Sequence, residues 1–133
     1  MSLPKPTPEM EALLARPLIA AIATEGPRGP HVAPVWFEYD GGVITVLTGR
    51  GSQKERNVRR DGRVGFTVFH AGRAVIVNGA ATVEPLADDA TLERLAVRYL
   101  GDDGARAYRA ARTPEAESVA LRVTPTHWMA YGL

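Results

Sequence analysis

The stretch VWFEYDGGVITVLTGRGSQKERNVRRDGRVGFTVF, residues 35–69, holds most of the pattern that decides the fold. It begins inside an apolar run, and residues 31–39 are predicted to form a strand. Asp40-Gly41-Gly42 follows and favours a tight hairpin turn, because glycine tolerates a positive φ. Residues 43–48 are then the return strand, and residues 63–70 repeat the strand pattern. The stretch therefore predicts antiparallel β structure.

The rest of the chain has the same kind of pattern. Four more apolar or alternating runs are predicted to be strands: 17–25, 74–86, 117–125 and 126–133. Gly79 predicts a bulge or a close backbone approach in the second of them. Helices are predicted after Thr7, an N-cap followed by proline, and over 88–101, where Gly101 is the stop; residues 102–112 add one or two turns. Six or seven short antiparallel strands with few helices favour a small closed barrel, because closure removes exposed edges.

Length and composition exclude several classes of protein. The chain has 133 residues, which predicts one domain over residues 1–133. Its net charge of +1 argues against a general nucleic-acid binder. It has no cysteine, so disulfides and thiolate chemistry are excluded. There is no apolar run long enough to cross a membrane and no signal-peptide pattern. We therefore expect a soluble, cytoplasmic protein that binds neither nucleic acid nor a membrane.

A basic segment, residues 49–64, contains six Lys and Arg and two acidic residues. It follows a predicted strand and opens a helix with Ser52 at the N-cap and Glu55 three residues later, which is the capping-box pattern. A helix N-terminus offers free N–H groups to an anion, and Thr48 and Lys54 add a hydroxyl and an ammonium. Three interpretations remain open: a seat for one phosphate, a nucleic-acid surface, or a solvated helix face. The solvated face is favoured for four arginines: Arg56, Arg59, Arg60 and Arg63.

The predicted strand 31–39 is apolar on both of its faces. Val32, Pro34 and Trp36 alternate with Ala33, Val35 and Phe37. A barrel needs only its inner face to be apolar, so something must cover the outside. Helices or a second copy of the chain are the two candidates, and the pattern favours self-association at least as much as cover by helices.

In the order of its motifs, the chain resembles the pyridoxamine 5′-phosphate oxidase-like, FMN-binding split-barrel superfamily. The resemblance covers residues 9–133 and is closest to small members that use FMN or the deazaflavin coenzyme F-420. Its elements are an aromatic strand, a hairpin, a Thr that ends the return strand, a Gly-Ser-x-Lys sequence, a short helix with Asn, and an Arg-Val strand. In this chain they are Trp36-Phe37, Thr48, Gly51-Ser52-Gln53-Lys54, Asn57 and Arg63-Val64.

The resemblance implies a six- to seven-stranded antiparallel split β-barrel with a few short helices that forms a homodimer. It implies that the cofactor lies between the subunits. The phosphate side of the cofactor would be held by Thr48, Arg50, Gly51, Ser52, Gln53, Lys54 and Asn57. The backbone of Val35, Trp36 and Phe37 would hydrogen-bond the ring system, and Arg73, Val75 and Trp128 would contact it from the partner. For Trp128, core or dimer packing remains an equal alternative.

The resemblance also implies an oxidoreductase that transfers hydride to a small organic acceptor. The chain departs from the oxidase proper at Leu47 and Gln53 and in its ending MAYGL, so activity on pyridoxamine phosphate is not expected. The similarity favours coenzyme F-420, with FMN next. A non-catalytic carrier of the cofactor, or of haem or a tetrapyrrole, is the alternative. No metal site is predicted, because the three histidines are far apart in the sequence. No residue is assigned as catalytic.

Overall fold

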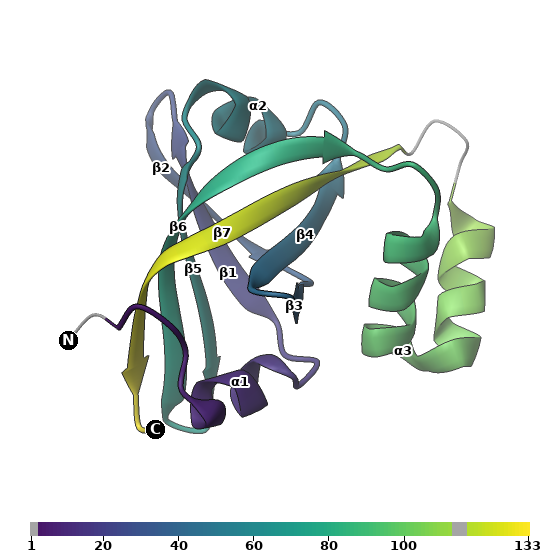
Figure 1. Ribbon diagram of the computed structural model, residues 1–133. Helices are drawn as coiled ribbons and strands as arrows, with labels where there is room; N and C mark the ends of the chain where they lie inside the picture. The colour runs from purple at the N-terminus through teal and green to yellow at the C-terminus, as the bar shows by residue number, and fades with distance from the viewer. Residues whose placement is uncertain (1–2, 113–116) are drawn as a thin grey trace.

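The computed structural model describes residues 3–112 and 117–133, and these form one seven-stranded antiparallel sheet and three helices. The strands lie in the order β2-β1-β5-β6-β7-β4-β3. Figure 1 shows the sheet coiled around a core, with α1 and α2 at opposite ends and α3 beside it. The strands are β1 (Ala20–Gly26), β2 (Gly29–Val35), β3 (Glu38–Asp40), β4 (Val43–Gly49), β5 (Arg63–His70), β6 (Arg73–Pro85) and β7 (Ser118–Tyr131). The helices are α1 (Pro8–Leu14), α2 (Gln53–Arg60) and α3 (Ala90–Ala111).

The core lies inside the coiled sheet. In β5 every second residue, Val64, Phe66 and Val68, is buried, as the two-residue period of a strand requires. Phe66 meets the ring of Phe37 edge to face, with ring centroids 5.1 Å apart. Buried residues of β1, β4, β5, β6 and β7 belong to the same core cluster, and the predicted mainly β split barrel is confirmed. None of the helices in the described ranges is long and apolar enough to span a membrane.

The hairpin and the helix caps agree with the sequence. Gly41 and Gly42 both have a positive φ, at 59° and 81°, and they join β3 to β4. Thr7 caps α1 by accepting the N–H of Met10. The bulge predicted at Gly79 is also present, as a register shift between β6 and β7. A Cβ at this position would lie 2.7 Å from the carbonyl oxygen of Thr124, so only glycine allows the strands to approach so closely.

The strand predicted over residues 31–39 is in fact two strands. β2 ends at Val35 and β3 begins at Glu38, with Trp36 and Phe37 between them. Phe37 is fully buried, and its backbone hydrogen-bonds a side chain of α3 instead of a neighbouring strand. The two strands predicted at 117–125 and 126–133 are, in contrast, one continuous strand, β7. Periodicity alone misses both results, because it does not show which backbone groups find a partner in the sheet.

The helix α3 covers both of the predicted helical segments and has two halves. Residues 88–101 and 102–112 were predicted as a helix and a short extension, and the structure joins them across Gly101, whose φ of 74° and ψ of 177° are not helical. The two halves lie side by side in Figure 1. Arg98 anchors the first half, because its guanidinium donates to the carbonyls of Leu14, Ala15 and Arg16 at the end of α1. These bonds satisfy carbonyls that the helix leaves free.

Candidate functional site

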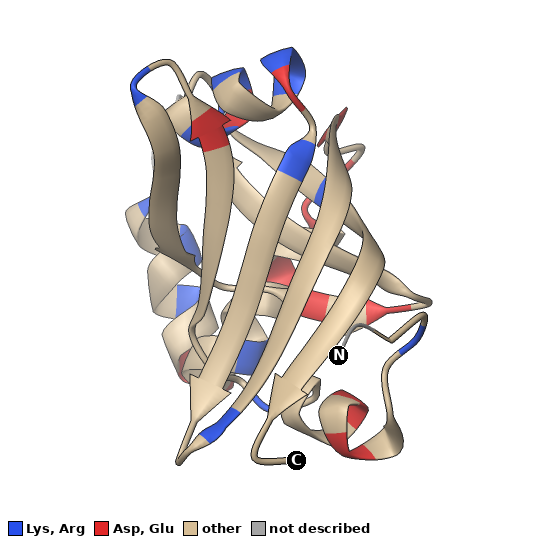
Figure 2. Cartoon of the chain, turned by 90° about the vertical axis from the view of Figure 1, so that its left-hand side faces the viewer, with Lys and Arg blue, Asp and Glu red and all other residues tan. Residues whose placement is uncertain are grey.

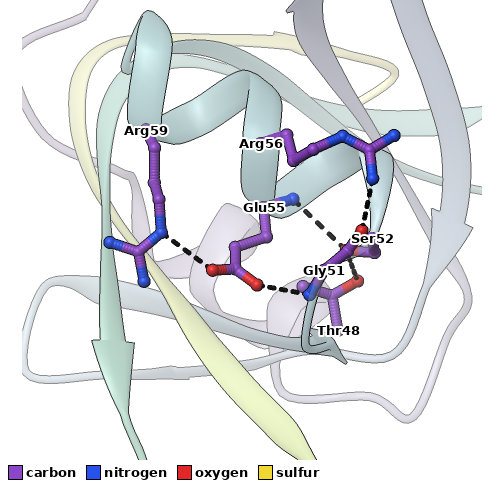
Figure 3. A network of polar contacts seen from close by, with 6 residues as sticks. All are labelled: Thr48, Gly51, Ser52, Glu55, Arg56 and Arg59. Atoms are coloured by element: carbon purple, nitrogen blue, oxygen red, sulfur yellow. Dashed lines mark hydrogen bonds and ion pairs between the residues drawn. The ribbon is translucent and has the colours of Figure 1, made fainter.

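The end of β4 and the start of α2 are joined by a network of short polar contacts (Figure 3). The hydroxyls of Thr48 and Ser52 lie 2.9 Å apart, and Ser52 accepts the N–H of Glu55 at 3.2 Å. Ser52 is therefore the N-cap, as the sequence predicts. The two hydroxyls have two protons between them, and their mutual bond uses one. When Ser52 is the donor in that bond, the proton of Thr48 is left for another acceptor.

Glu55 does not complete the capping box that its spacing predicts. Its carboxylate accepts the N–H of Gly51 at 2.6 Å and Nε of Arg59 at 2.8 Å (Figure 3). The N–H of Ser52, which a capping box would use, donates instead to the carbonyl of Gly49. The bond from Gly51 and the contact with Arg59 lower the pKa of Glu55. A carboxylate charge therefore lies beside the helix N-terminus, and Arg59 compensates it.

Lys54 is the cation that this network leaves free. Its side chain is half-buried, and within the described ranges its ammonium makes neither a hydrogen bond nor an ion pair. It lines a cleft of about 340 Å³ together with Thr48, Val35 and Trp36. The structure thus brings together four of the predicted site residues, from the ends of β2 and β4 and from α2.

Part of the lining of this cleft comes from α3. Leu92, Leu95 and Tyr108 line it, and none of them was among the predicted site residues. The ring of Trp36 stacks on Tyr99 at 5.0 Å with an interplanar angle of 7°, and it meets Tyr108 at 5.7 Å in a tilted arrangement. The apolar stripe of the predicted helix is the signal that could have indicated a packing face. It does not say which strand the helix meets.

Phe37 differs from Val35 and Trp36, the two residues that precede it. Its N–H donates to the hydroxyl of Tyr99 at 3.1 Å, and its ring is in the core. Its backbone N–H is therefore already bound within the chain. Val35 and Trp36 line the cleft, so of the predicted ring-binding segment these two residues are in place.

Asn57 and Gln53 connect α2 to the sheet. Asn57 is fully buried, and its amide donates to the hydroxyl of Thr24 on β1 at 3.0 Å. Its own oxygen accepts from the amide of Gln53 at 2.6 Å, and the oxygen of Gln53 accepts from Arg56. Both side chains are thus engaged with protein atoms. The structure does not place them on the cleft that Lys54 lines.

The remaining predicted site residues lie elsewhere in the chain. Arg50 is 70% exposed and pairs with Glu117 at 2.5 Å. Arg73 begins β6 at the turn from β5, which is the end of β5 away from α2 (Figure 1). Val75 is fully buried, and Trp128 is 3% exposed with its ring edge-on to a tyrosine of β3. Within one subunit, Trp128 therefore has the packing role that the sequence left open, and contact from a partner stays a prediction.

Comparison with known proteins agrees with this geometry. The curated FMN-binding protein of Nitratidesulfovibrio vulgaris is 43% identical over 54 residues, which are 38% of this chain and only 44% of that protein. Among solved structures, an F-420 reductase is 30% identical with a TM-score of 0.74, covering 90% of this chain and 94% of the other. A FAD-binding protein of Mesorhizobium loti has the same fold, with a TM-score of 0.71 at 18% identity over 98% and 96% of the two chains. The family model described as pyridoxamine 5′-phosphate oxidase matches residues 6–131, so the chain belongs to that family.

Proposed function

We propose that the protein is an oxidoreductase that binds a phosphorylated flavin-type cofactor and acts on a small organic acceptor. The deazaflavin coenzyme F-420 is favoured as the cofactor, and FMN is next. The observation that carries the proposal is the ammonium of Lys54, which is without a partner among the described residues and lines a cleft next to the N-terminus of α2. The likeness to an F-420 reductase and to an FMN-binding protein supports the two cofactors.

The phosphate is held at the start of α2. Lys54 supplies the charge, and the hydroxyl of Thr48 donates a hydrogen bond from the floor of the same cleft. The helix dipole favours an anion here. The negative charge of Glu55 opposes the binding of an anion, but Arg59 offsets that charge. Glu55 is itself buried, with 7% of the residue exposed. The phosphate therefore lies on the side of Lys54, away from Glu55.

The ring system lies along the wall made by Val35, Trp36 and Tyr108. Aromatic and apolar side chains exclude water there, and backbone groups of Val35 and Trp36 orient the polar edge of the ring. When bound, the cofactor supplies the hydride that the acceptor takes up. The protein contributes position and electrostatics, and no side chain is assigned a proton-transfer role.

A second copy of the chain completes the site. The outer face of the sheet carries exposed apolar side chains, with Val32 at 65%, Phe69 at 67% and Tyr131 at 66% exposure. Phe69 pairs with Ala74, and Ala74 pairs with Tyr131, so the two rings lie on one face. In Figure 2 the strands of this face carry charge mainly near their ends. Such a face favours a symmetric dimer, in which the partner's surface covers the apolar side chains and adds a wall to the cofactor cleft.

Titration of the purified protein with FMN and with coenzyme F-420, followed by absorbance and fluorescence, tests the proposal. We expect both to bind, the deazaflavin more tightly and with a steeper loss of affinity as salt rises, because its tail is more acidic. Turnover of the reduced cofactor with added acceptors separates an enzyme from a carrier. If neither cofactor binds at concentrations that saturate related flavoproteins, the proposal is wrong.

A further inference from the structure

A second and larger cleft lies beside the first. Its volume is about 860 Å³, within the range of sites for small organic molecules. Leu92 and Ser118 line both clefts, so the two are neighbours. Four arginines line it, from the loop after β4, from α2 and from the end of α3: Arg50, Arg59, Arg109 and Arg112.

Three of these arginines have ion-pair partners that leave part of each guanidinium unused. Arg50 uses Nη1 toward Glu117, Arg59 uses Nε toward Glu55, and Arg109 uses Nη1 toward Glu93 at 2.7 Å. A guanidinium has five N–H donors. The pair of Arg50 is also largely exposed, and exposed pairs contribute little to stability. A ligand carboxylate can therefore bind these arginines without a large loss of existing contacts.

The lining of this cleft also has apolar residues: Pro85, Leu86, Leu92 and Val119. Three acidic residues also line it. Glu117 already pairs with Arg50, and Asp88 accepts the N–H of Ala90 at the start of α3. The third is Asp89. Glu55 and Glu93 also compensate Arg59 and Arg109 from outside the lining, so a ligand anion would use the N–H donors that these arginines leave free, and not a net positive charge. A lining with both arginines and aliphatic side chains fits a molecule that has both an anionic group and an apolar body.

We propose that this arginine cleft binds an amphipathic organic acid, a carboxylate on an apolar body, and that such acids are the substrate class of the protein. The assignment as substrate rests on the proposed function, because it uses the contact between this cleft and the cofactor cleft through Leu92 and Ser118. The assignment as a binding site rests only on the arginines and the apolar residues that line the cleft.

The test uses two fluorescent probes with the same apolar body, pyrenebutyric acid and its uncharged alcohol, pyrenebutanol. Their binding to the full chain is measured by fluorescence anisotropy. We expect the acid to bind about two- to five-fold more tightly than the alcohol, which is the effect of one exposed ion pair. Equal affinity of the two probes would overturn the proposal, because the arginines would then contribute nothing.

Two substitutions on α3 should have opposite effects. Arg109→Gln removes a cleft arginine and should reduce the preference for the acid, whereas Glu93→Gln removes the carboxylate that holds Arg109 and should increase it. Arg106→Gln is the matched control, because Arg106 is an exposed arginine of the same helix that pairs with Asp103 and does not line the cleft. An equal change in all three variants would contradict the assignment. Circular dichroism checks that each variant is folded.

Cofactor titrations with the same variants show whether the cleft binds a separate organic acid or the acidic tail of coenzyme F-420. If Arg109→Gln weakens coenzyme F-420 but leaves pyrenebutyric acid unaffected, the cleft holds the cofactor's acidic tail and the proposal is overturned. If the acid follows the arginine variants while neither cofactor binds, the cleft is retained and the proposed function fails. We expect the acid to follow the variants and FMN, which has no acidic tail, to be insensitive to them.

Discussion

The hydroxyl of Tyr99 on α3 accepts the backbone N–H of Phe37 at 3.1 Å, between residues 62 positions apart in the sequence. The same hydroxyl donates to the carbonyl of Leu18 at 2.7 Å, and the ring stacks on Trp36. One side chain of α3 thus holds two other segments: the approach to β1, and the link between β2 and β3, whose Trp36 lines the candidate cleft.

Tyr99→Phe should therefore destabilise the protein while keeping its ring contacts. It leaves the buried N–H of Phe37 without an acceptor, which typically costs about 1–3 kcal/mol. Urea denaturation measures the change. Tyr108→Phe is the matched control, because the hydroxyl of Tyr108 makes no hydrogen bond with the described residues although its ring also meets Trp36. Equal stability losses in the two variants would contradict the role given to the Tyr99 hydroxyl.

Lys54→Ala should weaken cofactor binding roughly ten- to a hundred-fold, because a charge-assisted hydrogen bond is typically worth about 1.5–3 kcal/mol. Arg60→Ala removes the same charge from the same helix but changes a contact with the carbonyl of Glu25, so its effect should be small. Isothermal titration with the favoured cofactor gives both affinities. A similar loss in the two variants would indicate a general basic surface instead of one phosphate seat.

Ser52→Gly should also weaken cofactor binding, because the Ser52 hydroxyl, 2.9 Å from that of Thr48, orients the Thr48 proton that donates to the phosphate. Glycine is tolerated at an N-cap, so this variant should lose only a few tenths of a kcal/mol of stability, whereas Ser52→Ala should lose about 1 kcal/mol. Thermal unfolding and cofactor titration of both variants separate the cap from the ligand contact. If both variants bind as the parent protein does, Ser52 acts on the helix alone.

The stability of the protein should fall in acid through Asp61. Side-chain hydrogen bonds from Arg63, together with its backbone N–H, lower the pKa of Asp61 from 3.8 to about 2. A carboxyl whose pKa is lower in the folded state stabilises that state above its unfolded pKa and loses this effect as the pH falls through the folded value. The difference in urea midpoint between the parent and Asp61→Asn should therefore be present at neutral pH and shrink between pH 3.8 and about 2. A constant difference over this range would contradict the ion pair's contribution.

The protein should sediment near twice its mass of 14.3 kDa. Phe69→Glu adds a charge to the exposed apolar face and should shift the equilibrium toward monomer. Arg56→Glu is a control, since it adds an acidic side chain at an exposed position of α2. Sedimentation velocity at micromolar concentration gives the mass of the parent protein and of both variants. A monomeric parent protein would remove the shared-site part of the proposed function.

The local features were predicted correctly because they depend on neighbouring residues. Gly41-Gly42 adopts a positive φ whatever packs around it, and Ser52 caps the helix that follows it. The strand 63–70 was predicted to the residue, since the same two-residue period that buries its alternate side chains is visible in the sequence. The family resemblance rests on the same ordered local motifs.

Tertiary structure decided which hydrogen-bond partners several site side chains have. The sequence places Asn57 one turn from Ser52, but Thr24 on β1 lies closer and takes its amide. Glu55 has capping-box spacing, but the N–H of Ser52 donates to the carbonyl of Gly49, so the Glu55 carboxylate accepts the N–H of Gly51 instead. Each polar group binds the nearest suitable partner in three dimensions. That partner depends on which strand a helix packs against, and the spacing of residues along the chain does not contain this information.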